Sequence, residues 1–361
     1  MSSTDPYLDD FEELDKYEIY ETQFDPMLTD RQARRRRKPK VHHTAKKEQT
    51  EVIDELAEVG SIEGAEFTTT YAPARFEGGW LLDAVRGFFV EEQISDILYQ
   101  VKGGKEANVY CAQAHEVMDM DLLAVKVYRP RMFRNLSNDA MYRQGRKLLA
   151  TDGYPIKDRD HRVTRAVNKK TAFGVQVQHT SWLMHEFNSM LRLFEAGGAV
   201  PEPIASGDNA ILMTYCGDSS MAAPTLNGVR LERDAGKRLF QKTLDNINLM
   251  LQHDMIHGDL SAYNILYWDD DITLIDFPQV VNSRGNSDAY FILQRDITRI
   301  CEYFSQQGVD CDPQAITDDF WLRYIEPDPE DKAADESKRD YVDWVTFEGQ
   351  EEEEEETDND E

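Results

Sequence analysis

Three residues in the second half of the chain have the types and the spacing of a phosphoryl-transfer site. Asp259 and Asn264 stand five positions apart in HGDLSAYNILY (257–267), and Asp276 follows twelve positions later, at the end of an apolar run. Such a site needs a base for the acceptor hydroxyl, and an amide and a second carboxylate for the metal that bridges the phosphates. Taken singly, the residues have ordinary alternatives, namely a helix or turn cap, an Asx turn and a strand end.

A lysine within an apolar run adds a cation to this set. Lys126 lies in LLAVKVY (122–128), where an ammonium without a partner would be costly to desolvate, so we expect it to reach a carboxylate or phosphates. Glu186, on a predicted amphipathic helix beside Phe187, is its natural carboxylate partner. The alternatives are a lysine that extends to the surface and a solvated helix glutamate.

The turn at 103–109 has the sequence Gly-Gly-Lys-Glu-Ala-Asn-Val and could cover the phosphates of a nucleotide. It lacks the GxGxxG form, and two glycines also mark an ordinary hairpin.

The segments around these residues predict a sheet followed by helices. Alternating apolar residues predict three antiparallel strands, and a later pair of strands completes a sheet of five. Between them, apolar residues at helical spacing predict a helix over 183–194, which Gly197 and Gly198 close. The expected strands are 94–103, 106–114, 122–128, 200–206 and 210–216.

The segment after Leu231 has mainly helical spacing. One long amphipathic face runs from Leu239 to Leu251, and two short apolar runs at 265–268 and 272–275 predict a hairpin. Helical spacing returns over 289–304 and in the segment that ends at 320–325. The chain therefore predicts an α+β fold of two lobes, the first rich in strands and the second mainly helical.

Charge divides the chain into the same parts. The net charge of −29 includes −9 in residues 1–30, +8 in 31–50 and −15 in 326–361. We expect residues 1–75 and 326–361 to be mostly disordered, because neither can bury much apolar area. The domain then covers 76–325, with a first lobe over about 76–216, a flexible basic insertion at 129–180 and a second lobe over about 217–325.

Composition excludes several classes of protein. The chain has no apolar stretch of about 18 residues, and its acidic start does not resemble a signal peptide, so we expect a cytoplasmic protein without membrane contact. Because the four cysteines lack CxxC spacing and the eight histidines include only one close pair, we expect neither a disulfide framework nor a structural metal site.

In order along the chain, these motifs resemble the RIO family of atypical protein kinases. The resemblance covers about residues 80–325 and rests on the segments around the residues above: GGKEANVY (103–110), AVKVY (124–128), the Glu186 helix, VPEPI (200–204), HGDLSAYNILY (257–267) and LIDFPQVV (274–281). It implies a trimmed protein-kinase fold that binds ATP between its lobes and lacks the activation segment and the APE region.

The resemblance also implies a role for each matched residue. Asp259 would be the catalytic acceptor, Asn264 and Asp276 would hold Mg²⁺, and Lys126, oriented by Glu186, would bind the α- and β-phosphates of ATP. The expected residues of the phosphate loop and of the adenine-binding hinge are Gly104, Lys105, Glu106, Val109, Met213, Tyr215 and Cys216.

These features predict ATP- and Mg²⁺-dependent phosphorylation of serine or threonine, including autophosphorylation. The family is also associated with an aspartyl-phosphate, here on Asp276, so an ATPase switch is an alternative. A scaffold for ribosomal RNA or a pre-ribosomal particle is another, because basic residues gather in 31–40 and in the insertion. In a further alternative, the acidic tail 326–361 pairs with the basic run 31–40 and competes with RNA for it. The basic insertion and HGDLS resemble the first RIO subfamily, whereas IDFPQ resembles the second. We therefore expect a first-subfamily-like member or a divergent one, for example from a bacterium.

Overall fold

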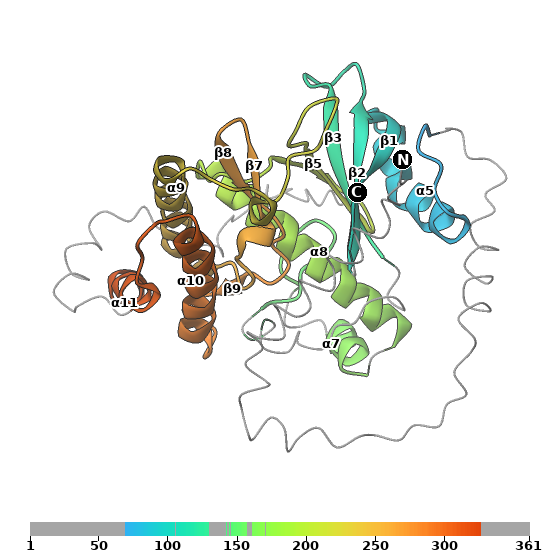
Figure 1. Ribbon diagram of the computed structural model, residues 1–361. Helices are drawn as coiled ribbons and strands as arrows, with labels where there is room; N and C mark the ends of the chain where they lie inside the picture. Colours follow the sequence, from blue (N-terminus) through green and yellow to red (C-terminus); the bar gives the residue numbers. More distant parts are fainter. Residues whose placement is uncertain are drawn as a thin grey trace, which may run out of the picture.

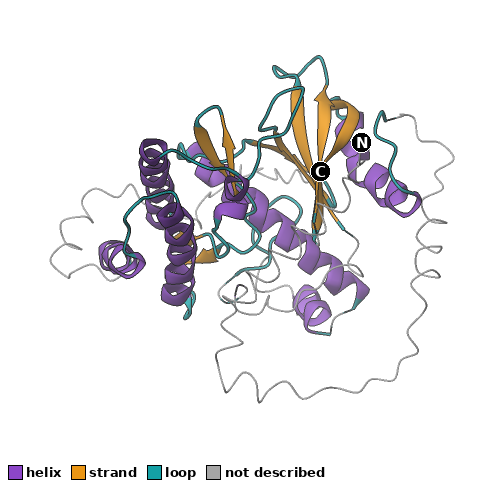
Figure 2. Cartoon of the chain, viewed as in Figure 1, coloured by secondary structure: helices purple, strands orange, loops and turns teal. Residues whose placement is uncertain are grey.

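The computed structural model describes residues 69–325, apart from Lys105, 130–141, Arg143, Gly145, 157–160 and Lys170. The predictions for residues 1–68, for the tail 326–361 and for Lys105 lie outside this part of the chain. Figures 1 and 2 show the described residues as a strand-rich lobe, a mainly helical lobe and a long helix, α8, that runs between them.

The first lobe is built on an antiparallel sheet in the order β1-β2-β3-β5-β4. This arrangement confirms the predicted three-strand meander and the later pair. The strands are β1 (Ile94–Gly103), β2 (Ala107–Ala114), β3 (Leu122–Tyr128), β4 (Pro203–Ser206) and β5 (Ala210–Thr214).

The two faces of the sheet meet different partners, because successive side chains of a strand point to opposite sides. On β3, Leu123 and Val125 belong to the core cluster around α5, whereas Ala124 and Tyr128 belong to the cluster that contains α8. Lys126 shares the parity of the second pair, so its side chain extends toward α8 and the helical lobe.

Helix α5 (Arg75–Val90) was not predicted from the sequence. It covers one face of the sheet with Leu81, Val85 and Phe88, all buried. At its start the Glu77 carboxylate accepts a hydrogen bond from the Ala74 N–H at 3.3 Å, which satisfies one of the exposed donors of the first turn.

Helix α8 (Ala172–Glu195) begins eleven residues before the predicted helix, inside the predicted flexible insertion. Thr171 caps it by accepting a hydrogen bond from the Gly174 N–H at 3.1 Å. Helix α7 (His161–Asn168) also lies within that insertion. The later part of the predicted insertion 129–180 thus contains helices, which the sequence analysis did not predict.

The second lobe contains the predicted helices and hairpin. Helix α10 packs beside α9, with the Phe240 and Phe304 rings 5.2 Å apart, and α11 begins at an Asp312 cap followed by Pro313. A short sheet of β6 and β9, which was not predicted, brings Ile256 opposite Val281. The elements are α9 (Arg233–Gln252), β6 (Met255–Ile256), β7 (Ile265–Trp268), β8 (Asp271–Leu274), β9 (Val281–Asn282), α10 (Ala289–Gln306) and α11 (Pro313–Tyr324).

None of the helices in the described ranges is long and apolar enough to span a membrane.

Candidate functional site

Lys126, Glu186 and Asp276 meet where β3, α8 and the end of the β7–β8 hairpin approach one another. The Lys126 ammonium lies 2.5 Å from Glu186 Oε1 and 2.5 Å from Asp276 Oδ1. Glu186 is buried and also accepts a hydrogen bond from the hydroxyl of Tyr128, which lies two positions beyond Lys126 on the same face of β3. The lysine therefore reaches carboxylates from both lobes.

The charges of this group oppose the effect of burial. Burial lowers the pKa of Lys126, but Asp276 and Glu186 together raise it above its ordinary range. Burial raises the pKa of Asp276, but the charge and the hydrogen bond of Lys126 outweigh that effect, so the pKa of Asp276 lies below its usual value. Lys126 is consequently a cation and Asp276 an anion near neutral pH.

Asp276 follows β8 in a left-handed backbone conformation, with φ of +72°. Non-glycine residues adopt this region rarely, and Asp is among the few that tolerate it. The Ile275 N–H donates to the Asn264 carbonyl at 3.0 Å, so Asn264 and Asp276 lie at the same end of the hairpin.

Asp259 is more enclosed than Asp276. Its Oδ1 lies 2.6 Å from Arg299 Nη1 of α10, and its Oδ2 accepts from Asn264 Nδ2 at 3.1 Å. The side chain of Asp259 is 8% exposed, against 41% for Asp276. Both carboxylate oxygens of Asp259 are thus held by protein donors, whereas the Asp276 side chain contacts Lys126 and is also partly exposed to solvent.

The turn that carries Asp259 is fixed from two sides. His257 Nε2 donates to the Ile275 carbonyl at 3.1 Å, and His257 Nδ1 accepts from the Asp259 N–H at 3.3 Å. On the other side, Asp296 of α10 accepts from the Gly258 N–H at 2.8 Å, and Arg295 donates to the Gly258 carbonyl. Burial raises the pKa of the Asp296 carboxyl, although the neighbouring arginines oppose that shift.

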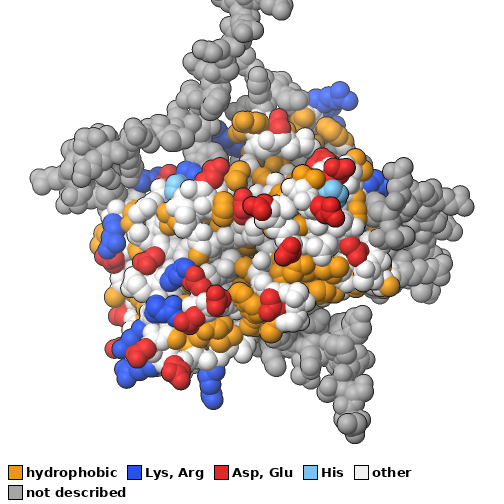
Figure 3. Space-filling view, turned by 90° about the horizontal axis from the view of Figure 1, so that it is seen from above, with side chains coloured by type: hydrophobic (Ala, Val, Ile, Leu, Met, Phe, Trp, Pro, Cys, Tyr) orange, Lys and Arg blue, Asp and Glu red, His pale blue; other side chains and the backbone are white. Residues whose placement is uncertain are grey.

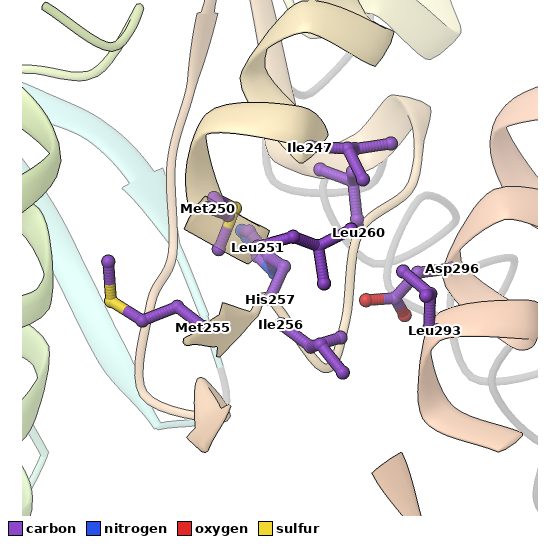
Figure 4. Close-up of a pocket in the computed structure, with 9 residues that line it drawn as sticks. All are labelled: Ile247, Met250, Leu251, Met255, Ile256, His257, Leu260, Leu293 and Asp296. Carbon is purple, nitrogen blue, oxygen red and sulfur yellow. The ribbon is translucent and has the colours of Figure 1, made fainter. Parts of the chain in front are cut away.

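A small apolar cavity of about 10 Å³ lies behind this turn. Figure 4 shows Asp296 at its edge, reaching from α10 toward Leu260 and the turn. The space is at the lower limit for one water molecule, so the back of the turn is closely packed. Its walls are formed by Ile247, Met250, Leu251, Met255, Ile256, His257, Leu260, Leu293 and Asp296.

A segment from the predicted insertion contacts the loop after Asp276. Arg146 Nη2 donates to the carbonyls of Pro278 at 2.8 Å and Val280 at 2.6 Å. The same segment is attached to α8, because the His185 ring donates to the Lys147 carbonyl at 2.7 Å. The helix that supplies Glu186 therefore also supports the loop that follows Asp276.

The predicted phosphate-loop residues lie at the β1–β2 turn. Val109 pairs directly with Lys126 across β2 and β3. The Glu106 carbonyl accepts from the Arg129 N–H at 2.8 Å, and the Gly104 N–H donates to Asn108 Oδ1 at 3.4 Å. Apart from Lys105, which is not among the described residues, this group lies beside the lysine strand.

The predicted hinge residues follow or end β5. Met213 is a buried β5 residue opposite Ala124. The Tyr215 hydroxyl lies 2.9 Å from that of Tyr99 on β1, and burial together with this contact raises the Tyr215 pKa. Cys216 Sγ donates to Thr273 of β8 at 3.5 Å. The three residues thus connect the sheet to the second lobe.

The donor atoms at the hairpin end fit a magnesium ion that phosphates help to hold. The amide nitrogen of Asn264 donates hydrogen bonds to Asp259, which leaves the amide oxygen to serve as a metal ligand. Asp276 adds a carboxylate. Mg²⁺ is commonly bound by one or two carboxylates together with substrate phosphates. No cluster of three or more His, Cys, Asp or Glu that could hold a metal ion occurs within the described ranges.

Several residues of this site were missed by the sequence analysis, above all Arg295, Asp296 and Arg299. All three are buried on α10. A signal was present, since these charges interrupt the apolar face of AYFILQRDITRICEYF. Tyr128 and Arg146 have no comparable signal.

Comparison with known proteins shows which family this chain resembles. The family described as "RIO1: RIO domain" matches residues 142–316. The protein named "RIO-type serine/threonine-protein kinase Rio1" from Thermoplasma acidophilum is 30% identical over 135 residues, which cover 37% of this chain and 69% of the relative. "Serine/threonine-protein kinase RIO1" from Chaetomium thermophilum is 31% identical over 228 residues, 60% of this chain and 41% of that relative.

The domain has two lobes and brings Lys126, Glu186 and Asp276 together. It therefore has the two-lobed, protein-kinase-like α+β fold that the motifs predicted. The chain belongs to the RIO family. It spans less than half of the length of the Chaetomium relative. The solved structure titled "Crystal structure of the Rio2 kinase from Chaetomium thermophilum" matches with a TM-score of 0.47 at 21% identity, over 75% of this chain and 76% of that one.

Proposed function

We propose that this protein is an ATP- and Mg²⁺-dependent serine/threonine protein kinase. The observation that supports the proposal is the contact of Lys126 with Glu186 and Asp276. A protein kinase needs both a lysine–glutamate ion pair and a metal-binding aspartate in place for phosphoryl transfer. The names of the relatives agree with the activity.

In the proposed reaction, Lys126 binds the α- and β-phosphates while Glu186 holds its ammonium. Asp259 accepts the proton of the acceptor hydroxyl, whose oxygen forms the new bond to the γ-phosphorus as the bond to the ADP oxygen breaks. Asn264 and Asp276 would hold Mg²⁺, which would supply positive charge next to the phosphates. The loop residues Gly104, Lys105, Glu106 and Val109 line the phosphates, and the hinge residues Met213, Tyr215 and Cys216 line the adenine.

The test is labelling with ATP that carries a radioactive γ-phosphate. Wild-type protein should incorporate label on serine or threonine, and Asp259→Ala should not. Asp245→Ala, an exposed substitution on α9, controls for the loss of one carboxylate. Equal labelling of wild type and Asp259→Ala would contradict the assignment.

A second candidate is an ATPase switch through an aspartyl-phosphate on Asp276. It is favoured by the 41% exposure of the Asp276 side chain, when both oxygens of Asp259 are engaged. An acyl-phosphate is cleaved by hydroxylamine, whereas phosphoserine is not. Label that resists hydroxylamine completely would exclude this route.

An RNA or pre-ribosomal partner is a proposal from a different class. Figure 3, in which the molecule is seen from above, shows acidic side chains scattered among hydrophobic ones and basic side chains at several places toward the edges. The basic run 31–40 and part of the basic insertion lie outside the described residues. Binding of ribosomal RNA that weakens steeply with salt, and is lost on deletion of 31–40, would support this role. The cytoplasmic location stays a prediction.

A further inference from the structure

A buried polar group lies behind the β1–β2 turn, on the side of α5. Glu77 of α5 is 6% exposed and Asn108 of β2 is 3% exposed. Asn108 Nδ2 donates to Glu77 Oε1 at 3.2 Å and to the Tyr110 hydroxyl at 3.0 Å. The Tyr110 hydroxyl in turn donates to Glu77. Neither side chain belongs to the set assigned above.

Glu77 is itself held in place. Its Oε2 accepts hydrogen bonds from the Tyr71 hydroxyl at 3.0 Å and from the Ala74 N–H at 3.3 Å. The Tyr71 backbone is attached to the sheet, because its N–H donates to the Ile97 carbonyl at 2.8 Å. Burial and the Glu77 carboxylate raise the pKa of Tyr110 far above its ordinary range, so this hydroxyl keeps its proton. The carboxylate therefore has a fixed position relative to β2.

The carboxylate helps to determine which way the Asn108 amide points. Both oxygens of Glu77 accept hydrogen bonds, so the NH₂ group of Asn108 faces Glu77 and the amide oxygen faces the turn. There the oxygen accepts from the Gly104 N–H at 3.4 Å and from Arg129 Nε at 3.0 Å and Nη2 at 2.9 Å.

One amide oxygen thereby joins two segments beside the phosphate-binding region. Gly104 belongs to the turn, and Arg129 directly follows β3, three positions after Lys126. The two segments are also joined by the backbone, since the Arg129 N–H donates to the Glu106 carbonyl. Asn108 thus joins the turn to the lysine strand, and Glu77 on one side and Arg129 on the other together fix the orientation of its amide.

We propose that Glu77 is a positioning residue for ATP: by helping to orient Asn108, it holds Gly104 and Arg129 in the arrangement that receives the phosphates. The inference rests on the proposed function. It adds that α5, which precedes the residues matched by the family description, takes part in nucleotide binding.

The test reverses the hydrogen bond. Asn108→Asp places two carboxylates against each other, so we expect the KM for ATP to rise at least about 10-fold while kcat changes less than about 3-fold. The double variant Glu77→Gln with Asn108→Asp restores an amide–carboxylate pair of the same net charge. Its KM should return to within about 3-fold of wild type. Asn188→Asp, the same chemical change on α8 at a residue that donates to the Gly153 carbonyl, should leave the KM unchanged.

Hydrogen exchange of the amides at 103–109 gives a readout that needs no nucleotide. Exchange should accelerate in Asn108→Asp and slow again in the double variant, at temperatures where circular dichroism shows all variants folded. Unchanged exchange in Asn108→Asp, or a single-variant KM defect that the double variant does not correct, would overturn the inference. If wild-type protein binds no ATP, the proposed function fails, whereas the exchange experiment still decides whether Glu77 positions the turn.

Discussion

Lys126 and Asp276, 150 positions apart in the sequence, form a direct ion pair of 2.5 Å across the two lobes. The same ammonium is shared with Glu186. In the proposed reaction Asp276 would hold Mg²⁺ and Lys126 would bind the α- and β-phosphates, so this pair places the two phosphate-binding groups side by side.

Replacing Lys126 by Met should lower the free energy of unfolding by about 3 kcal/mol, because Glu186 would stay buried without its cation. Urea denaturation measures this difference. Lys242→Met removes an exposed lysine paired with Asp271 and should cost less than about 1 kcal/mol. Equal losses in the two variants would show that burial does not distinguish these pairs.

Replacing Arg299 by Lys should lower kcat by about 10- to 100-fold and leave the KM for ATP nearly unchanged. A lysine keeps the positive charge beside Asp259 but not the geometry of the guanidinium. The Asp259 carboxylate would therefore be misplaced, while the nucleotide contacts remain. Steady-state kinetics of autophosphorylation or of a peptide substrate measures both constants. Arg323→Lys, in an exposed pair with Asp319, is the control and should match wild type. An unaltered kcat in Arg299→Lys would contradict the prediction.

Gly258→Ala should destabilise the protein by at least about 3 kcal/mol and abolish phosphoryl transfer. Its φ is +83°, and an added Cβ would lie 2.3 Å from the Gln279 carbonyl oxygen. Gly197 has a nearly equal φ of +84° with no atom within 4 Å of such a Cβ, so Gly197→Ala isolates the backbone cost of about 1 kcal/mol. Thermal denaturation should rank the two variants in this order. Similar melting temperatures would mean that the close approach to Gln279 carries no cost.

The His185 imidazole should make the protein less stable in weak acid. Burial lowers its pKa from 6.5 to about 4, although its hydrogen bond to the Lys147 carbonyl opposes the shift. Between these values the unfolded chain binds more protons than the folded one, so this contribution is complete above pH 6.5 and is lost as the pH falls toward 4.

We expect wild type to lose about 1 kcal/mol more than His185→Gln between about pH 7.5 and about pH 5.5, as measured by urea denaturation. His115→Gln, at the β2–β3 turn, controls for the removal of one imidazole. A wild-type and a His185→Gln protein with the same pH dependence would rule out this source of acid sensitivity.

The strands and the hairpin were predictable because their alternation has a short period and glycine or charged turns bound them. Helix α5 was not, since Gly78 and Gly79 weaken its helical pattern and its stability comes from packing Leu81, Val85 and Phe88 on the sheet. The early part of α8 was missed for a similar reason, because it lacks a continuous apolar stripe and begins only at the Thr171 cap.

At the site, the sequence predicted the residues that form local motifs and missed those that act through tertiary contacts. The pairing of Lys126 with Glu186 followed from the chemistry of a lysine in an apolar strand, and the structure brings the two together. Arg299 meets Asp259 across 40 positions, and Arg146 meets Pro278 across 132. Such distances leave no periodic trace in a single sequence.

The contacts of Arg146 with the Pro278 and Val280 carbonyls bear on the speed of turnover. They tie the segment attached to α8 to the second lobe. Separation of the lobes for nucleotide exchange would have to break these bonds. We therefore expect release of ADP, rather than the transfer step, to limit the rate, with a burst of product in the first turnover.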